Sequence, residues 1–144
     1  LKQTGQEIRW YILGDGPQRK KIEQGIKKAG LKKDIILLGM VRNPYPYLLQ
    51  CDLYVHITRY EGKSIAIEEA QVLGKAIIAS DCPGNREQIT HRKNGLLVPF
   101  DREKIFQAIL ELCKDKKQRE QYGKENARLD FARKEMVTEF CNMI

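Results

Sequence analysis

The chain has 144 residues, a length that allows one domain with one buried core and is too short for two Rossmann-type halves. Lysine and arginine outnumber aspartate and glutamate by 26 to 19, and the net charge of +7 favours anionic partners such as nucleotides, nucleic acids or acidic lipids. The charge is spread along the chain without an aromatic-rich binding motif, so we expect no nucleic-acid partner. No apolar run approaches the roughly 20 residues that span a bilayer.

The cysteines are scattered, with no C-x-x-C pair and no histidine cluster nearby, which argues against a zinc site. They are Cys51, Cys82, Cys113 and Cys141. We therefore expect free thiols in a reducing cytoplasm, and no bound metal.

Short β-rich runs alternate with segments of helical periodicity, which predicts an α/β fold with a Rossmann-like parallel sheet and helices on both faces. In chain order we expect strand 8–13, helix 17–29, strand 35–38, a short helix within 43–50, strand 53–57, helix 64–73, and strands 76–79 and 96–98. Helices over 102–113, 117–129 and 134–144 form a helical C-terminal tail. Gly14 and Gly16 are interpreted as a tight turn after the first strand, because Gly-x-Gly alone is a weak phosphate signal.

The loop 58–63 is the first candidate for a binding site. It follows the apolar strand 53–57, and in an open parallel sheet ligands bind outside the carboxyl ends of the strands. The helix after the loop is expected to be capped by Ser64 or to open at Gly62. Backbone N–H groups at such a helix start suit a phosphate.

Two adjacent acids lie in the helix after this loop. Glu69 has apolar neighbours three and four positions away, whereas Glu68 lies beside Ser64 and Gln71, so we expect Glu69 to be the more buried carboxylate. A buried carboxylate needs hydrogen-bond donors, which either the protein or ligand hydroxyls could supply.

Glu61 stands in the loop, where we expect it to be exposed. Glu69 lies about 7 to 8 Å along the helix axis and leans back towards the helix start, so the two acids would flank an anion held there. A diphosphate between two polyhydroxyl groups, as in a nucleotide-sugar, fits this arrangement. The alternative is that the helix acids only complement the macrodipole and that Glu61 is a surface loop residue; the spacing alone does not decide.

Residues 60–70 read YEGKSIAIEEA, and Glu61 and Glu69 match the Glu-x7-Glu motif of the retaining glycosyltransferases of family 4. The chain resembles the C-terminal, nucleotide-sugar-binding domain of these enzymes, which have the GT-B fold. Further matches are YILGDGP at 11–17, LLG at 37–39, LGKAIIA at 73–79 and NGLLVP at 94–99. Several motifs in order are more specific than one.

The resemblance implies transfer of a sugar from a UDP-sugar or GDP-sugar to a glycan or lipid-linked acceptor, with retained configuration and without a cofactor or an essential metal. Glu61 would position the donor sugar, and Glu69 would bind the ribose hydroxyls. Gly62, Lys63 and Ser64 would lie along the diphosphate through their backbone N–H groups. The Lys63 side chain would add charge at the phosphates or face water. The departing phosphate would help to deprotonate the acceptor, so Glu61 need not be a nucleophile.

Other positions carry weaker signals. The loop 39–43 matches the place where the family holds the base, and Arg42 is either a base or phosphate contact or a solvated arginine. Residues 84–87 resemble a further loop of the donor site, although a turn and a helix start would explain them equally well. His56 and His91 are interpreted as structural.

The family's N-terminal acceptor domain, and the Arg and Lys pair that neutralises the diphosphate, find no match in this chain. We therefore expect residues 1–144 alone to bind the donor weakly and to be inactive. The whole protein is expected in the cytoplasm, either free or peripheral at the inner face of the membrane. The alternatives are a non-catalytic nucleotide-binding module and an interaction or nucleic-acid domain on a Rossmann-like scaffold.

Overall fold

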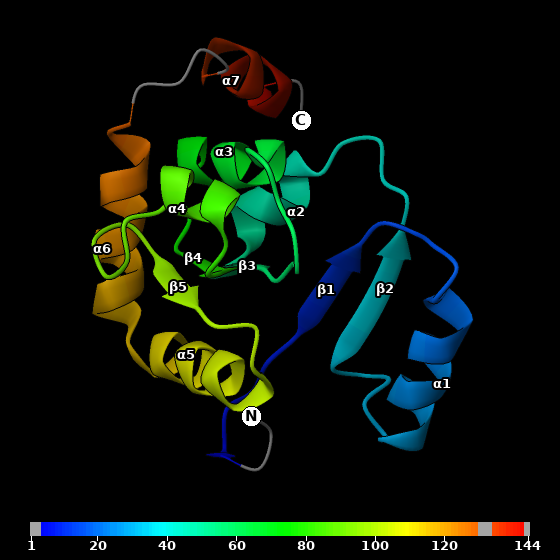
Figure 1. The fold of residues 1–144 in the computed structure, drawn as a ribbon. Helices are drawn as coiled ribbons and strands as arrows, with labels where there is room; N and C mark the ends of the chain where they lie inside the picture. The colour runs from blue at the N-terminus through cyan, green and yellow to red at the C-terminus, as the bar shows by residue number, and fades with distance from the viewer. Residues whose placement is uncertain (1–3, 130–133, 143–144) are drawn as a thin grey trace. The chain divides into compact units, whose positions relative to one another are not determined.

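The computed structural model describes residues 4–129 and 134–142 of the chain. The chain divides into two compact units, Leu1–Pro44 and Tyr45–Ile144. Each unit has its own parallel sheet, with β1 and β2 in the first and β3, β4 and β5 in the second (Figure 1).

The first unit is a β–α–β segment. Strand β1 (Trp10–Leu13) is followed by helix α1 (Arg19–Lys28) and strand β2 (Ile35–Gly39), and Trp10 pairs with Ile35 at the start of the parallel ladder. The helix ends before Gly30, whose φ of +68° is the left-handed conformation that glycine adopts without a Cβ penalty. This position matches the expected helix end.

The sheet of the second unit has the order β3-β4-β5. Its strands are β3 (Tyr54–His56), β4 (Ile77–Ser80) and β5 (Leu96–Val98). All four residues of β4 are buried, because this strand has a neighbour on each side and helices over the sheet. The carboxyl end of β3 leads directly into the loop that carries Glu61.

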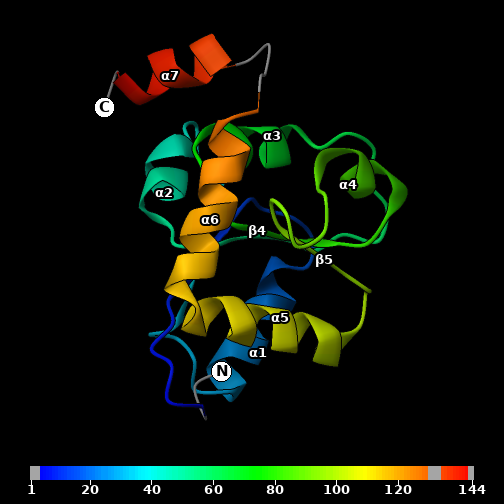
Figure 2. The same cartoon turned by 90° about the vertical axis from the view of Figure 1, so that its left-hand side faces the viewer.

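Helices cover both faces of this sheet. The helices of this unit are α2 (Tyr45–Gln50), α3 (Ile65–Val72), α4 (Pro83–Gln88), α5 (Arg102–Lys114), α6 (Lys116–Ala127) and α7 (Lys134–Asn142). Figures 1 and 2 show α3 and α4 over one face and α5 over the other. Helix α7 packs on α2 and α3. Asp115 ends α5 and caps α6, where its side chain accepts a hydrogen bond from the backbone N–H of Gln118 at 2.9 Å.

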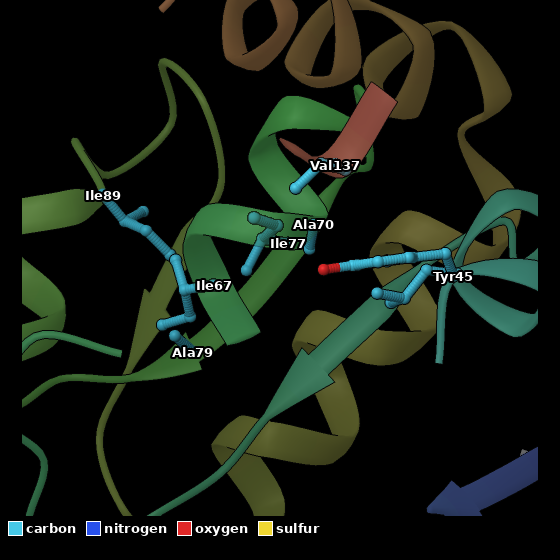
Figure 3. Packing of buried hydrophobic residues seen from close by; sticks show 8 residues of the cluster. Tyr45, Ile67, Ala70, Ile77, Ala79, Ile89 and Val137 are labelled. Atoms are coloured by element: carbon cyan, nitrogen blue, oxygen red, sulfur yellow. The ribbon is translucent and has the colours of Figure 1, made fainter. Parts of the chain in front are cut away.

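The hydrophobic core of the second unit lies between α3 and the sheet (Figure 3). Ile67 of α3 and Ile77 of β4 are fully buried, and Val137 of α7 reaches the same cluster. Each such side chain contributes roughly 1.5 to 3 kcal/mol when it leaves water. The core therefore fixes α3 on the sheet, and with it the position of the helix start after the Glu61 loop.

A buried polar network joins α6 to the rest of this unit. The amide Nδ2 of Asn126 donates to the carbonyls of Lys75 and Asn94, both at 2.8 Å, and Asn126 Oδ1 accepts from Gln71 Nε2 at 3.2 Å. The backbones also meet closely, because a Cβ on Gly123 would overlap the carbonyl oxygen of Gly74.

The structure confirms the expected α/β class, with parallel sheets and flanking helices. The five strands are divided between a two-stranded sheet, β1-β2, and a three-stranded sheet, β3-β4-β5. Apolar runs reveal strands, whereas pairing depends on long-range contacts that a run does not encode. Residues 84–87, for which a turn and helix start was one explanation, lie inside α4. The last two residues of the expected helix 134–144 lie outside the described residues.

Candidate functional site

Residues 57–64, called here the Glu61 loop, connect β3 to α3. The start of the loop is fixed to the neighbouring strand. The hydroxyl of Ser80, the last residue of β4, donates to the carbonyl of Thr58 at 2.6 Å and accepts from the Thr58 N–H at 3.0 Å. These two bonds tie the loop to the centre of the sheet.

The end of the loop is held by a side chain from α4. The Ser64 N–H donates to Gln88 Oε1 at 2.8 Å, and Gln88 Nε2 donates to the Ser64 carbonyl at 2.9 Å. Ser64 is the N-cap of α3, as expected, although its side chain makes no capping hydrogen bond. The Ser64 N–H, one of the expected diphosphate contacts, is therefore already used by the protein.

The middle of the loop lies against the first turn of α4. A Cβ on Gly84 would overlap the carbonyl oxygens of both Glu61 and Gly62. Glycine is needed at this position because there is no room for a Cβ. The backbone conformation of Gly84 is one that other residues also adopt. The segment 84–87 therefore supports the loop by direct backbone contact.

The Glu61 carboxylate is bonded to an imidazole. Its Oε2 lies 2.8 Å from His56 Nε2, and His56 Nδ1 lies 3.2 Å from the Tyr54 hydroxyl. The Glu61 side chain is 29% exposed, so Glu61 is more buried than the exposed loop residue that the sequence predicted. The sequence interpretation gave His56 no partner. The only sequence signal is that a histidine stands at the end of an apolar strand, immediately before the loop.

Tyr54 lies near both acids of the Glu-x7-Glu pair. Burial raises the pKa of its hydroxyl to about 12, with further contributions from the charges of Glu69 and, less strongly, Cys51 and Glu61. The hydroxyl therefore stays protonated at neutral pH and can donate to His56 Nδ1. Sequence analysis missed this residue, because a tyrosine in a strand is ordinarily a core residue.

Glu69 is bonded to a side chain of α2. The hydroxyl of Tyr45 donates to Glu69 Oε1 at 2.9 Å, and Figure 3 shows this hydroxyl directed from α2 towards α3. The expectation that Glu69 is hydrogen-bonded is confirmed, and the donor belongs to the protein. Tyr45 itself is buried and was missed, since the sequence shows nothing that brings α2 to α3.

The expected order of burial of the two helix acids is wrong. Glu68 is 8% exposed, whereas Glu69 is only partly buried. The polar neighbours that suggested a solvent-facing Glu68 are themselves buried, with Ser64 at 6% and Gln71 at 0%. Packing from α4 and α6, and not the polarity along one helix, decides which face is covered.

Lys63 forms an ion pair with the buried acid. Its Nζ lies 2.6 Å from Glu68 Oε1, and the lysine side chain is largely exposed. The pair offsets the cost of placing the Glu68 carboxylate in the protein interior. The Lys63 charge therefore stabilises the Glu68 carboxylate of α3, in addition to any role at a ligand bound to the loop.

The structure brings together the main expected site residues. Glu61, Gly62, Lys63, Ser64 and Glu69 lie within the unit Tyr45–Ile144 and on one loop and the helix after it.

Arg42 is exposed and belongs to the unit Leu1–Pro44. Among the described residues, no group of three or more His, Cys, Asp or Glu side chains is placed to hold a metal ion. None of the described helices is long and apolar enough to cross a bilayer.

Residues 1–129 match the family model of the glycosyl transferases group 1. The chain is 30% identical over 118 residues to the N-acetylgalactosamine-N,N'-diacetylbacillosaminyl-diphospho-undecaprenol 4-alpha-N-acetylgalactosaminyltransferase of Campylobacter jejuni, covering 81% of this chain and 32% of that protein. It is 28% identical over 136 residues to the alpha-D-kanosaminyltransferase of Streptomyces kanamyceticus, covering 92% of this chain and 35% of that protein. The chain thus spans about a third of the length of these curated relatives.

Solved structures give the same fold. Anabaena HepE in complex with UDP superposes with a TM-score of 0.79 at 21% identity, over 95% of this chain and 41% of that chain. The C-terminal domain of a glycosyl transferase group 1 family protein (LpcC) from Francisella tularensis gives 0.69 at 28% identity, over 78% of this chain and 62% of that one. The chain therefore belongs to the group 1 glycosyl transferases, with the α/β fold of the GT-B enzymes.

Proposed function

We propose that this chain is the donor-binding domain of a retaining, family 4 glycosyltransferase that uses a UDP-sugar or a GDP-sugar. The observation that carries the proposal is the pair Glu61 and Glu69 after β3, in which each carboxylate is oriented by a hydrogen bond from its own unit. Two further findings support it: the similar HepE protein has been crystallised with UDP and with UDP-glucose, and the Campylobacter and Streptomyces relatives are named as sugar transferases.

In this proposal Glu61 hydrogen-bonds the hydroxyls of the donor sugar, and Glu69 binds the ribose. The backbone N–H groups of Gly62 and Lys63 lie along the diphosphate, and that of Ser64 joins them only if it leaves Gln88. The bond from His56 fixes one Glu61 oxygen, which suits an orienting role better than nucleophilic attack. The departing phosphate oxygen then accepts the proton of the acceptor hydroxyl on the same face of the sugar.

The acceptor side of the reaction belongs to the rest of the protein in this proposal. The chain spans about a third of its curated relatives, so we place the acceptor domain and the Arg and Lys pair at the diphosphate outside residues 1–144. The chain alone then binds the donor weakly and transfers nothing. We propose a cytoplasmic enzyme acting on a glycan or lipid-linked acceptor, and the net charge of +7 supports contact with an anionic membrane face.

The test is donor binding and sugar transfer by the full-length protein with UDP-glucose, UDP-N-acetylglucosamine and GDP-mannose. Because a hydrogen bond to a charged group contributes about 1.5 to 3 kcal/mol, Glu61→Gln should lower kcat/KM roughly 10- to 100-fold. Glu69→Gln should chiefly raise KM for the donor. The control is Glu120→Gln, which changes an exposed acid of α6 and should leave both constants unchanged.

Three results would separate the possibilities. Transfer that is lost in Glu61→Gln supports the enzyme. Donor binding without transfer by the full-length protein would favour a non-catalytic nucleotide-binding module. Absence of binding to every donor, and to UDP and GDP, would contradict both.

A further inference from the structure

We propose that His56, supported by Tyr54, is a positioning residue that sets the orientation of Glu61 and thereby governs recognition of the sugar part of the donor. This inference rests on the proposed function, since it assumes that Glu61 contacts the sugar. It adds that the nucleotide part of the donor is recognised through a separate arm of the site, in which Tyr45 holds Glu69.

The first step is the geometry around the imidazole. His56 Nε2 lies 2.8 Å from Glu61 Oε2 and 3.5 Å from Ser64 Oγ, so this nitrogen faces the middle and the end of the loop. The other nitrogen, Nδ1, faces the Tyr54 hydroxyl at 3.2 Å. Both ring nitrogens therefore have partners, and the ring is fixed in its plane.

The second step is the direction of the hydrogen bonds. A carboxylate can only accept, so Nε2 must carry the hydrogen that is donated to Glu61. In the neutral imidazole Nδ1 is then an acceptor, and the protonated hydroxyl of Tyr54 supplies the matching donor. One tautomer thus satisfies all three groups: the Glu61 carboxylate requires it, and the Tyr54 hydroxyl supplies the matching donor at the other ring nitrogen.

The sheet holds both His56 and the start of the Glu61 loop in place. His56 is the last residue of β3 and pairs with the buried Ala79 of the central strand β4. The loop is also fixed to β4 through Ser80. Glu61 therefore takes its orientation from the sheet, and a ligand meets a carboxylate that is already placed.

The two acids are held by side chains of different elements. Glu69 takes its hydrogen bond from Tyr45 of α2, an element different from the strand that holds His56. Because the two positioning bonds come from different elements, each can be removed while the other stays. The inference therefore predicts two distinct phenotypes.

The experiment measures the sugar increment, defined as the ratio of the Kd for a nucleoside diphosphate to the Kd for the matching nucleotide-sugar. Calorimetric titration of the full-length protein would use UDP with UDP-N-acetylglucosamine and GDP with GDP-mannose. In the pair that the wild type prefers, His56→Leu should lower the increment roughly tenfold and leave the Kd of the diphosphate unchanged. His56→Gln should retain part of the increment, since its amide can still donate.

Matched variants test each part of the inference. Tyr54→Phe should lower the increment less than His56→Leu, because the imidazole can still donate to Glu61 and only the hydrogen bond at Nδ1 is lost. Tyr45→Phe should weaken both ligands equally and keep the increment. His91→Gln removes the other histidine, which accepts a bond from the Leu97 N–H, and should change neither Kd.

For the His56, Tyr54 and His91 variants, an unchanged Kd of the diphosphate shows that the protein is folded. If Glu61→Gln loses the increment but His56→Leu keeps it, the inference is overturned while the proposed function stands. If the wild type binds none of these diphosphates and nucleotide-sugars, the proposed function fails and the inference falls with it. An equal loss of affinity for diphosphate and nucleotide-sugar in His56→Leu would mean that His56 is merely structural, which also overturns the inference.

Discussion

At the scale of single residues, Gly84 is the described glycine at which an added Cβ would lie nearest to a neighbouring atom. A methyl group there would overlap the carbonyl oxygens of Glu61 and Gly62, so Gly84→Ala must move either α4 or the loop. We expect a loss of about 1 to 3 kcal/mol in the free energy of unfolding, measured by urea denaturation. Gly25→Ala in α1 is the control, because nothing lies within 4 Å of its Cβ and alanine favours helix there. Equal urea midpoints for Gly84→Ala and the wild type would contradict the close contact.

Tyr54 gives a prediction for alkaline pH. Its pKa is raised above the ordinary value of 10.0 to about 12, so the folded state holds the phenolic proton more tightly than the unfolded state. The resulting stability is fully present below about pH 10 and is lost as the pH rises towards about 12. We expect Tyr54→Phe to remove this part of the pH dependence, on the order of 2 kcal/mol.

The measurement is the free energy of unfolding of the wild type and of Tyr54→Phe between about pH 8 and pH 11. The difference between the two proteins should shrink as the pH rises. Tyr47→Phe, at an exposed tyrosine, should give a constant difference. A constant difference for Tyr54→Phe as well would show that its hydroxyl is not held in the protonated form.

Spacing, helix geometry and the resemblance predicted Glu61 and Glu69 as candidate site residues, but not the groups that hold them. His56 precedes Glu61 by five residues across the end of a strand, and Tyr45 precedes Glu69 by 24, so neither pair follows a helical or strand period. Such contacts are fixed by tertiary packing. The same packing reversed the expected burial of Glu68 and Glu69.

At the scale of elements, the buried side chain of Asn126 contributes much of the polar attachment of α6. Asn126 bonds the carbonyls of Lys75 and Asn94 and the amide of Gln71. Asn126→Ala leaves these groups without their partner, and we expect a loss of about 2 to 4 kcal/mol in urea denaturation. Lys124→Ala, at an exposed position of the same helix, should stay within about 0.5 kcal/mol of the wild type. A similarly small effect of Asn126→Ala would mean that packing alone holds α6.

Most elements could be predicted from period and turn residues. The five strands and the helices α1, α3, α5 and α6 lie within a few residues of their expected positions, because their apolar periods and glycine stops are local signals. Helix α4 was less evident. It has six residues, and its role is to place Gly84 and Gln88 against the Glu61 loop, which no local pattern expresses.

At the scale of the whole molecule, the two units should differ in stability. Ile26 is the one buried hydrophobic side chain among the described residues of Leu1–Pro44, whereas Tyr45–Ile144 contains the core around Ile67 and Ile77. Backbone amides open more often where little apolar surface is buried. We expect hydrogen exchange in β1 and β2 to be at least tenfold faster than in β4, roughly 1.4 kcal/mol in opening free energy.

Exchange followed by mass spectrometry of peptides from the whole chain would measure this difference. The control is helix α7 of the second unit, in which Glu135, Thr138 and Glu139 are exposed and which should also exchange faster than β4. Equal protection of β2 and β4 would show that the units open together. The division into two sheets was not predictable, since all five strands carry similar apolar runs.

The Glu61 loop also has a consequence for protein engineering. The residues that hold the two acids and the loop all lie between Tyr45 and Gln88, which is one continuous segment of one unit. A chimera that carries residues 45–88 into a related glycosyltransferase would therefore transplant the acids together with their supports. The chimera should then show the sugar preference of this chain, whereas exchange of Glu61 alone would leave out the residues that orient it.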